Sequence, residues 1–351
     1  MISLIRAELN LGYEEILPKP LHPQIEIYKE QKSLKTMYDP TKPYKQQVLD
    51  IIRSTWETPY VKVKPGAYPI IIKKFSGLEV DHTDGIGTKG VYHWAQRTFR
   101  NASLDALAMN LNDLALARAI PYKLQNHIII PEDDKAAIIE IVETLAEECR
   151  KRKIAITGGE ISIHNNTQGM DISMTVSGFI KKDKPNQLLP GDTLIGLRSS
   201  GLHSNGFTKV REVFGEEFRP EFVEPTKIYL DDVLRLDKKY DIHGMMHITG
   251  GAYTKLKDVL HNADAIISKN HYLYPQKIFR ELYKRGISDQ EMYKTFNCGI
   301  GFVLGVPQKQ AERTVSFLNR EQDAADIIGR VVAGKGVVRI ESAFSDKGVE
   351  Y

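Results

Sequence analysis

Apolar and polar residues follow the periods of both helices and strands from residue 68 onward. The spacing i, i+3, i+4, i+7 predicts a helix over 103–119 and a second one after Asp133 or Asp134, either of which can cap a helix N-terminus. Short apolar runs and strict alternation predict strands in the same half of the chain. These predicted strands cover 69–75, 78–80, 154–156 and 171–181.

A polar break at 181–191 separates a second half with the same mixture of patterns. This half contains predicted strands at 193–197 and 299–306. Three helices are predicted in this half: one that begins after Asn205, one at 228–236 and one at 308–318. Because strands and helices mix in both halves, we predict a fold of the α/β plus α+β class.

Residues 1–66 differ from the rest of the chain because prolines interrupt them throughout, and proline restricts both itself and the residue before it. Only 46–56 has a helical pattern. Since tyrosines and a tryptophan occur along the segment, we interpret it as an arm that docks on the folded part; a mobile tail is the alternative. The predicted domains are therefore the arm at 1–66, an N-terminal domain at 67–182 and a C-terminal domain at 183–351.

The composition argues against several classes of protein. Lys plus Arg number 48 and Asp plus Glu number 45, so the net charge is +3, which is too small to indicate a nucleic-acid partner. The two cysteines form no CxxC pair, which argues against a disulfide framework or a cysteine zinc site. No apolar run approaches the roughly 18 residues of a membrane helix. We therefore expect a soluble, cytoplasmic protein with neither a membrane nor a nucleic-acid partner.

The segment DHTDGIGTKG follows a predicted strand and has the composition of a phosphate-binding turn. Gly85 and Gly87 let backbone amides approach an anion closely, while Thr88 and Lys89 add a hydroxyl and a positive charge. Asp84 can bind a divalent cation through oxygen. The spacing of a Walker A loop is absent. The alternative is a structural glycine turn with a surface lysine.

The predicted helix over 103–119 carries polar side chains beside its apolar stripe. Asp105 and Asn112 are seven residues apart and share one face, and Asp113 lies next to Asn112. Carboxylates beside a buried stripe are costly unless they are paired or bound to metal. Asp113 and Asp84 would supply the two carboxylates that Mg²⁺ uses beside nucleotide phosphates. A solvated helix face is the alternative.

Two further segments combine small polar residues with glycine. TGGE follows a predicted strand and indicates a tight turn with Glu160 at its tip, which by itself is only weak support for a site. The loop SSGLHSNGF precedes a predicted helix and favours an anion site, in which His203 can transfer a proton near neutral pH. A polar capping loop is the alternative, and no GxSxG elbow supports a serine nucleophile. The candidate residues of this loop are Ser200, Gly201, His203, Ser204, Asn205 and Gly206.

Two glycine motifs lie further along the chain. HITGG predicts either a ligand-binding turn formed by His247, Thr249 and Gly250 or a structural turn with one packed histidine. His243 and His247 are four residues apart but lack the glutamate of an HExxH metal site. FNCGIG favours close packing of a strand at glycine over a nucleophilic role for Cys298.

The order of these motifs is more specific than any one of them. Between Asp81 and Pro307, the series DGIGTK, NDL, GGE, SSGLHSNGF, HITGG and EMYKTFNCGIG resembles the family of aminoimidazole ribonucleotide synthetases, the phosphoribosylformylglycinamidine cyclo-ligases. The segment EPTKIY, which begins at Glu224, is similar to a further motif of that family. The resemblance implies a two-domain PurM-like fold, in which the N-terminal domain forms a β-barrel shared across a homodimer.

The resemblance also implies a reaction in de novo purine biosynthesis. ATP phosphorylates the amide oxygen of formylglycinamidine ribonucleotide to give an iminophosphate and ADP. An amine nitrogen then attacks that carbon, closes the ring of 5-aminoimidazole ribonucleotide and expels phosphate. The implied cofactors are ATP and Mg²⁺, with a monovalent cation left open, and the implied partners are the small-molecule substrate and a second copy of the chain.

The residue roles implied by the resemblance fall into four groups. The implied catalytic residues are His203, His247 and Lys89. The implied metal ligands are Asp84, Asp105 and Asp113. The residues implied to bind the nucleotide are Asp84, Gly85, Gly87, Thr88, Lys89, Asn112, Asp113 and Glu160. Those implied to bind substrate or phosphate are Ser200, Gly201, His203, Ser204, Asn205, Gly206, Thr249 and Gly250.

The chain departs from the family pattern around the predicted cleft. A stiffer and more basic segment replaces the glycine-rich mobile loop, and Lys62 or Lys64 is the candidate to reach phosphate from it. ISIHNN follows GGE, and Ala252 stands where a third glycine is usual after HITGG.

Two alternatives remain: an ATP-dependent enzyme of the superfamily that activates another amide, and a nucleotide-binding pseudoenzyme. The retained acidic residues and lysine of DGIGTK and NDL argue against the second.

Overall fold

The computed structural model describes residues 43–66, 68–320 and 324–351, and residues 43–351 form one compact unit. Residues 1–42 of the predicted arm lie outside the described residues, so the docking of that part stays a prediction. Within the described part of the chain, no helix combines the length and the apolar character needed to cross a membrane. Cys149 and Cys298 are both buried and free.

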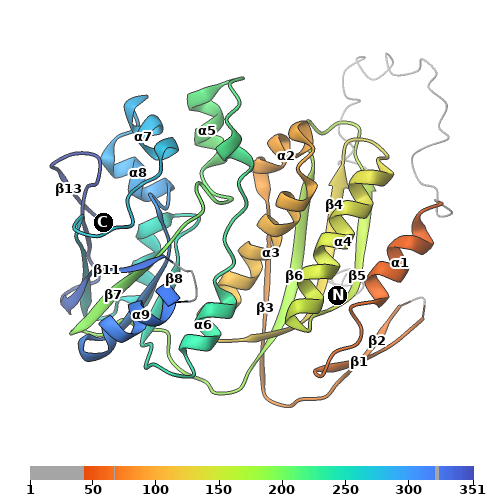
Figure 1. Ribbon diagram of the computed structural model, residues 1–351, viewed down its shortest axis with the longest axis horizontal. Helices are drawn as coiled ribbons and strands as arrows, with labels where there is room; N and C mark the ends of the chain where they lie inside the picture. Colours follow the sequence, from red (N-terminus) through yellow and green to blue (C-terminus); the bar gives the residue numbers. More distant parts are fainter. Residues whose placement is uncertain (1–42, 67, 321–323) are drawn as a thin grey trace, which may run out of the picture. The chain divides into compact units, whose positions relative to one another are not determined.

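The N-terminal half is built around a four-stranded sheet in the order β3-β6-β4-β5. β4 and β5 run parallel, and the other neighbouring strands are antiparallel. Helices α3 and α4 cover one face of this sheet (Figure 1). The elements are β3 (Leu78–Gly85), η3 (Gly87–Lys89), α2 (Gly90–Gln96), α3 (Phe99–Leu116), β4 (Ile120–Ile130), α4 (Lys135–Arg152), β5 (Ala155–Ile163) and β6 (Asp171–Ile180).

Both predicted helices of this half are confirmed. α4 begins directly after Asp134, whose carboxylate accepts a hydrogen bond from the backbone N–H of Ala137, as the predicted N-cap requires. α3 begins at Phe99 rather than at residue 103. The earlier start is explained by burial, because Phe99 and Ala102 belong to the same core as the predicted apolar stripe.

The described end of the predicted arm docks on the N-terminal half. α1 (Lys45–Arg53) packs on α4, and the antiparallel pair β1 (Val61–Lys64) and β2 (Ile70–Lys73) follows it. The indole N–H of Trp56 donates a hydrogen bond of 2.7 Å to the carbonyl of Ile156 on β5. An aromatic side chain therefore anchors this part of the arm, as its composition suggests. The exposed lysines of β1 are Lys62 and Lys64.

The prediction of a tight turn at TGGE is wrong. β5 continues through this segment to Ile163 and pairs in parallel with β4. A Cβ atom at Gly159 would lie 1.9 Å from Oδ1 of Asn126 on β4, so the absence of a side chain lets the two strands approach. Glu160 consequently stands exposed on a strand rather than at the tip of a turn.

The C-terminal half is built around a seven-stranded sheet in the order β13-β12-β9-β11-β7-β10-β8. β9 and β12 pair in parallel, and the other pairs are antiparallel. The strands are β7 (Asp192–Arg198), β8 (Gly244–His247), β9 (Ala263–Ile267), β10 (Ile300–Pro307), β11 (Ala325–Ala333), β12 (Val338–Glu341) and β13 (Gly348–Glu350).

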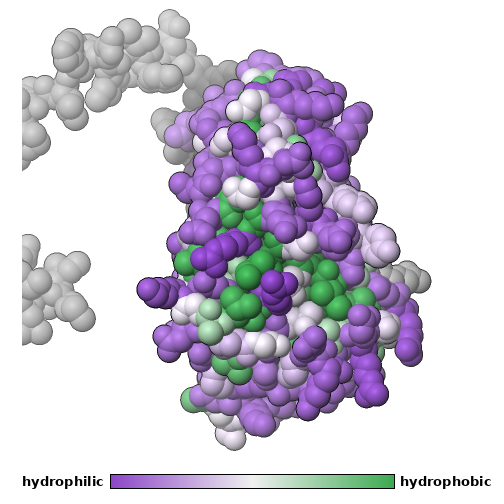
Figure 2. Space-filling view, turned by 90° about the vertical axis from the view of Figure 1, so that its left-hand side faces the viewer, coloured by the Kyte–Doolittle hydropathy of each residue, from purple (hydrophilic) through white to green (hydrophobic). Residues whose placement is uncertain are grey.

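The helices of this half confirm the predicted ones. Those after Asn205, at 228–236 and at 308–318 correspond to α5, α6 and α9. Apolar residues gather in the middle of the face that this half presents in Figure 2, and hydrophilic residues surround them. The helical elements are α5 (Phe207–Phe214), η4 (Pro220–Val223), α6 (Leu230–Leu236), η5 (Ala252–Val259), α7 (Lys277–Lys284), α8 (Asp289–Thr295), η6 (Gln308–Gln310) and α9 (Ala311–Arg320).

Candidate functional site

Residues from both halves line a pocket of ≈ 390 Å³. The N-terminal half contributes Asp84, Gly85, Gly87, Met109, Asp171 and Ser173. The C-terminal half contributes Ser204, Asn205, Thr249, Gly250 and Lys255. Three segments that lie far apart in the sequence, DGIGTK, HSNG and HITGG, therefore meet at one pocket.

The turn after β3 shapes the N-terminal wall of this pocket. Gly87 has a φ of +56°, a left-handed conformation that glycine adopts without strain. The carboxylate of Asp84 accepts a hydrogen bond of 2.7 Å from the N–H of Gly85. The pairing of β3 with β6 places Ser173 opposite Gly85 and brings Asp171 to the same wall. Sequence analysis missed Asp171 because only the strand pairing shows that it lies beside the glycine turn.

Lys89 lies in the interior and not on the pocket wall. Its side chain is fully buried, and its ammonium group lies 2.8 Å from Oδ2 of Asp105. The ammonium also donates hydrogen bonds to the carbonyls of Glu224, at 2.6 Å, and His203, at 3.0 Å. Burial lowers the pKa of Lys89, and Asp105 opposes that change. The surface-lysine alternative is wrong, and a phosphate contact does not fit because buried acceptors occupy the three donors.

Asp105 is enclosed in the same buried cluster. Its Oδ1 accepts hydrogen bonds from the N–H of Thr226, at 2.7 Å, and from the hydroxyl of Thr226, at 2.6 Å. Its Oδ2 lies 2.8 Å from both Lys89 and Nε2 of His93. Burial acts to raise the pKa of Asp105, but the neighbouring Lys89 and His93 outweigh it and hold the pKa well below its usual range. Since protein donors fill both oxygens, the predicted role of Asp105 as a metal ligand does not fit this position.

Asp113 lies between two histidines. Its Oδ1 is 2.9 Å from Nδ1 of His247, and its Oδ2 is 3.2 Å from Nε2 of His82. The amide of Asn112 donates toward Nε2 of His247 at 3.2 Å, so the proton of a neutral His247 lies on Nδ1 and points at Asp113. The hydrogen bond to Asp113 is the main cause of a raised pKa at His82. Sequence analysis missed His82. In this arrangement the carboxylate of Asp113 holds the imidazole rings of His82 and His247 in place.

His203 is fully buried directly before the two pocket residues of its loop. The backbone N–H of Ser200 lies 3.2 Å from its Nε2, so the proton of the neutral ring lies on Nδ1. Nδ1 is buried and has no hydrogen-bond partner. Burial lowers the pKa of His203 well below its usual value, so the ring is neutral at pH 7. Ser204 and Asn205 line the pocket beside it, whereas the ring packs inside the loop.

The chain matches two family models and known proteins in sequence. The model of the AIR synthase related protein N-terminal domain matches residues 77–180, and that of the C-terminal domain matches residues 190–341. A phosphoribosylformylglycinamidine cyclo-ligase of Saccharolobus solfataricus is 32% identical over 302 residues, which are 84% of this chain and 91% of the relative. The chain belongs to the AIR synthase family. A cyclo-ligase of Clostridium perfringens is 36% identical over 275 residues, 73% of this chain and 81% of that relative.

Solved structures show the same fold as this AIR synthase family member at low sequence identity. The hydrogenase maturation protein HypE in complex with ATP has a TM-score of 0.64 and 16% identity, covering 86% of this chain and 92% of that one. The thiamine-monophosphate kinase of Stenotrophomonas maltophilia has a TM-score of 0.63 and 17% identity, covering 84% and 95%. These likenesses, together with the two family models, confirm a mixed α/β, two-domain PurM-like fold.

The carboxylates predicted to bind metal have different surroundings in this family member, because Asp84 lines the pocket whereas Asp105 and Asp113 are paired with neighbouring side chains. In the ranges 43–66, 68–320 and 324–351, no group of three or more His, Cys, Asp or Glu side chains is placed to hold a metal ion. The carboxylates that line the pocket are Asp84 and Asp171. Oδ1 of Asp171 is buried without a hydrogen-bond partner, and burial raises the pKa of this group. An orphaned carboxylate oxygen beside a second carboxylate fits a cation in the pocket.

The remaining predicted residues of this AIR synthase family member do not line the pocket. Thr88 is exposed on η3, and Gly206 directly precedes α5. The hydroxyl of Ser200 donates a hydrogen bond of 2.5 Å to the carbonyl of Pro225, and Gly201 follows it in the loop. Glu160 stands on β5 in register with His127 of β4. The nucleotide-binding role of Glu160 stays a prediction.

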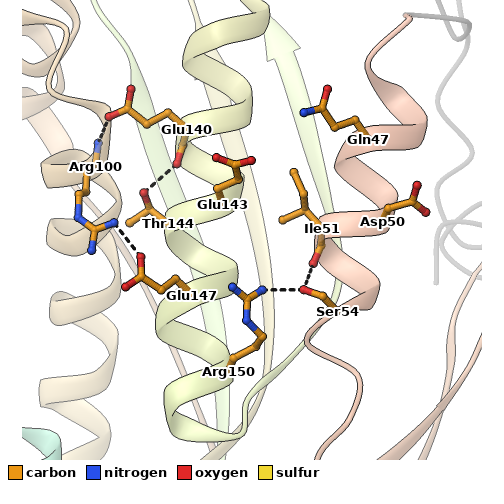
Figure 3. A pocket seen from close by; sticks show the side chains of 10 residues that line it. All are labelled: Gln47, Asp50, Ile51, Ser54, Arg100, Glu140, Glu143, Thr144, Glu147 and Arg150. Carbon is orange, nitrogen blue, oxygen red and sulfur yellow. Dashed lines mark hydrogen bonds and ion pairs between the residues drawn. The ribbon is translucent and has the colours of Figure 1, made fainter.

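A larger hollow of ≈ 940 Å³ lies between α1, α3 and α4. Figure 3 shows Arg100 beside Glu140 and Glu147, and Arg150 beside Ser54, along its walls. None of the predicted site residues lines it. Its volume exceeds that of the motif-lined pocket, yet its lining mixes charged side chains such as Arg100 and Glu147, which form an ion pair, with uncharged ones such as Gln47 and Thr144. The chemistry of the family motifs therefore belongs to the smaller pocket.

Proposed function

We propose that the protein is a ligase that closes the ring of 5-aminoimidazole ribonucleotide from formylglycinamidine ribonucleotide, at the expense of ATP. The observation that carries this proposal is the meeting of DGIGTK, HSNG and HITGG at one pocket, in a chain that covers 91% of a relative named for this reaction. The γ-phosphoryl group of ATP is transferred to the amide oxygen. The amine nitrogen then forms the ring bond as the C–O bond to phosphate breaks, and ADP and phosphate leave.

The pocket residues suit phosphoryl transfer, which depends mainly on positioning and on neutralising charge. The turn of Gly85 and Gly87 lets backbone N–H groups approach phosphate oxygens. The side chain of Lys255 supplies a positive charge on the opposite wall, and Ser204 and Asn205 supply neutral hydrogen-bonding groups. These five residues therefore replace Lys89 as the proposed contacts of the phosphate groups.

Mg²⁺ fits the pocket next to its two carboxylates, Asp84 and Asp171, of which Asp171 keeps one oxygen without a hydrogen-bond partner. We assign its protein ligands to Asp84 and Asp171, in place of the predicted set that included Asp105 and Asp113. Bound there, the ion neutralises charge on the nucleotide phosphates. The two carboxylates hold and orient it, while Asp105 and Asp113 act at a distance by fixing the elements that surround the pocket.

Replacing Asp171 by asparagine is expected to weaken the Mg²⁺ dependence of nucleotide binding. The neutral amide keeps the size of the side chain but removes the orphaned charge. Isothermal titration calorimetry measures ADP affinity at increasing Mg²⁺ concentration. The variant should need a roughly tenfold higher Mg²⁺ concentration than wild type to reach half of the maximal increase in ADP affinity. Asp346→Asn, at a fully exposed position, is the matched control and should behave as wild type. An unchanged Mg²⁺ requirement in Asp171→Asn would remove Asp171 from the proposed ligand set.

The exposed side of the four-stranded sheet supports a homodimer. β3 is an edge strand, and its residues Asp81 and Thr83 are exposed on the face opposite α3. The hydroxyl of Thr83 lies 2.8 Å from that of Thr175 on β6, so polar groups cover this face. The exposed apolar side chains near the start of β3 in the chain are Ile70 and Ile72 on β2 and Leu78 on β3 itself. We propose that a second copy covers this surface so that two sheets form a shared barrel.

Leu78→Arg is expected to convert the dimer into a monomer. Leu78 is 56% exposed in the single chain, and a charge there would be costly inside an apolar contact between copies. Sedimentation velocity at micromolar concentration measures the change. The control is Tyr272→Arg, at a residue that is 76% exposed in the C-terminal half. A monomeric wild-type protein, or a Leu78→Arg protein that remains dimeric, contradicts the proposed interface.

The reaction itself is tested by a coupled assay of ADP release with formylglycinamidine ribonucleotide, read together with colorimetric detection of the aminoimidazole product. Both products should appear in equal amounts. ADP release with other amides, but not with this substrate, would instead indicate another amide-activating enzyme of the superfamily. ATP binding without turnover on any of them would indicate a pseudoenzyme.

A further inference from the structure

The glycine motif at the start of β10 lies outside the pocket and yet touches the residues that shape it. A Cβ atom on Gly301 would lie 2.1 Å from the hydroxyl oxygen of Tyr229 and 2.5 Å from Cε1 of His203. Real Cβ atoms essentially never approach other atoms this closely. The backbone of Gly301 lies outside the left-handed region, so space, and not conformation, requires glycine here.

Neither neighbour of Gly301 can move freely. Tyr229 is fully buried; its hydroxyl donates to the carbonyl of Arg198 at 2.8 Å, and its N–H donates to Oδ1 of Asn112 at 2.7 Å. His203 is also fully buried, and the N–H of Ser200 lies 3.2 Å from its Nε2. Buried, hydrogen-bonded rings give way only at a substantial cost.

The position of His203 determines the course of the pocket loop. Its backbone carbonyl accepts a hydrogen bond of 3.0 Å from the ammonium group of Lys89, and the next two residues, Ser204 and Asn205, line the pocket. A displaced imidazole would therefore shift the backbone that presents these two side chains. The centre of the His203 ring lies 6.4 Å from that of His247, so the same displacement would reach the second predicted catalytic histidine.

We propose that Gly301 is a positioning residue, whose missing side chain leaves the space in which His203 and Tyr229 hold the pocket loop in its binding conformation. The kinetic part of this inference rests on the proposed function, whereas its structural part does not. Gly305 provides a matched comparison on the same strand. A Cβ atom there would lie 2.2 Å from Cδ2 of the buried Leu188, away from the pocket residues.

The test compares Gly301→Ala with Gly305→Ala in the full-length protein. Both variants should lower the melting temperature, but Gly301→Ala should lower kcat/KM about tenfold further. Nitrogen-15 NMR of labelled histidines should show His203 as the neutral Nδ1–H tautomer in wild type and in Gly305→Ala, and a shifted ring signal in Gly301→Ala. Adding Tyr229→Phe to Gly301→Ala removes the closest atom and should restore part of kcat/KM.

The NMR comparison separates the failure of this inference from that of the proposed function. Equal losses of kcat/KM and an unshifted His203 signal in both glycine variants would overturn the positioning role. If wild type shows no turnover, the proposed function fails, and the His203 signal alone decides the inference. If Gly301→Ala does not fold alone, the double variant with Tyr229→Phe is compared with Gly305→Ala in its place, with the same two criteria.

Discussion

Replacing Lys89 by methionine should lower the free energy of unfolding by about 3–5 kcal/mol, the range measured when one partner of a buried ion pair is removed. Lys89 and Asp105 are both fully buried, so solvent does not screen their interaction. Methionine would also leave the carbonyls of His203 and Glu224 without their shared donor. Urea denaturation followed by circular dichroism measures the loss.

Two further variants sharpen this prediction. Lys73→Met removes one partner of the exposed pair with Glu79 and should cost less than about 1 kcal/mol. Combining Lys89→Met with Asp105→Asn should recover part of the stability, because the second change removes the unpaired charge. If Lys89→Met retained wild-type stability and lost only nucleotide affinity, Lys89 would be a phosphate contact after all.

Replacing Asp84 by asparagine should lower kcat by about 10²–10³-fold while leaving stability within about 0.5 kcal/mol of wild type. Several kcal/mol of charge stabilisation would be lost, and each 1.4 kcal/mol corresponds to about tenfold in rate. The fold should tolerate the change, because an amide oxygen still accepts the hydrogen bond from the N–H of Gly85. Stopped-flow measurement of ADP release gives kcat, and thermal denaturation gives the stability.

The comparison with Asp113→Asn tests whether the two carboxylates have different roles. Asp113 binds His247 and His82, so its replacement should destabilise the protein as well as slow it. A second control, Asp346→Asn, should change neither quantity. An Asp84→Asn protein with wild-type turnover would contradict the assignment of Asp84 to the metal.

Local sequence predicted helices such as α3 and α4, because their signals are carried by neighbouring residues. The cap at Asp134 and the apolar stripe of α3 are examples. Local sequence made no prediction for several described strands, β4, β9 and β11 among them. The TGGE segment was misjudged for a specific reason. Glycine is a poor strand former by itself, and only the contact of Gly159 with Asn126 on the neighbouring strand shows why it belongs in β5.

The motifs and their order were sufficient to identify the family and the segments that meet at the pocket. They could not assign each charged side chain a role, because the sequence DGIGTK is identical whether its lysine contacts phosphate or is buried in the interior. That choice was made by the packing of the two halves, which encloses Lys89 with Asp105 and turns Asp113 toward two histidines. The same packing leaves Asp84 and Asp171 facing the pocket. A charge is stable only where partners or solvent compensate it, and residues distant in sequence supply those partners.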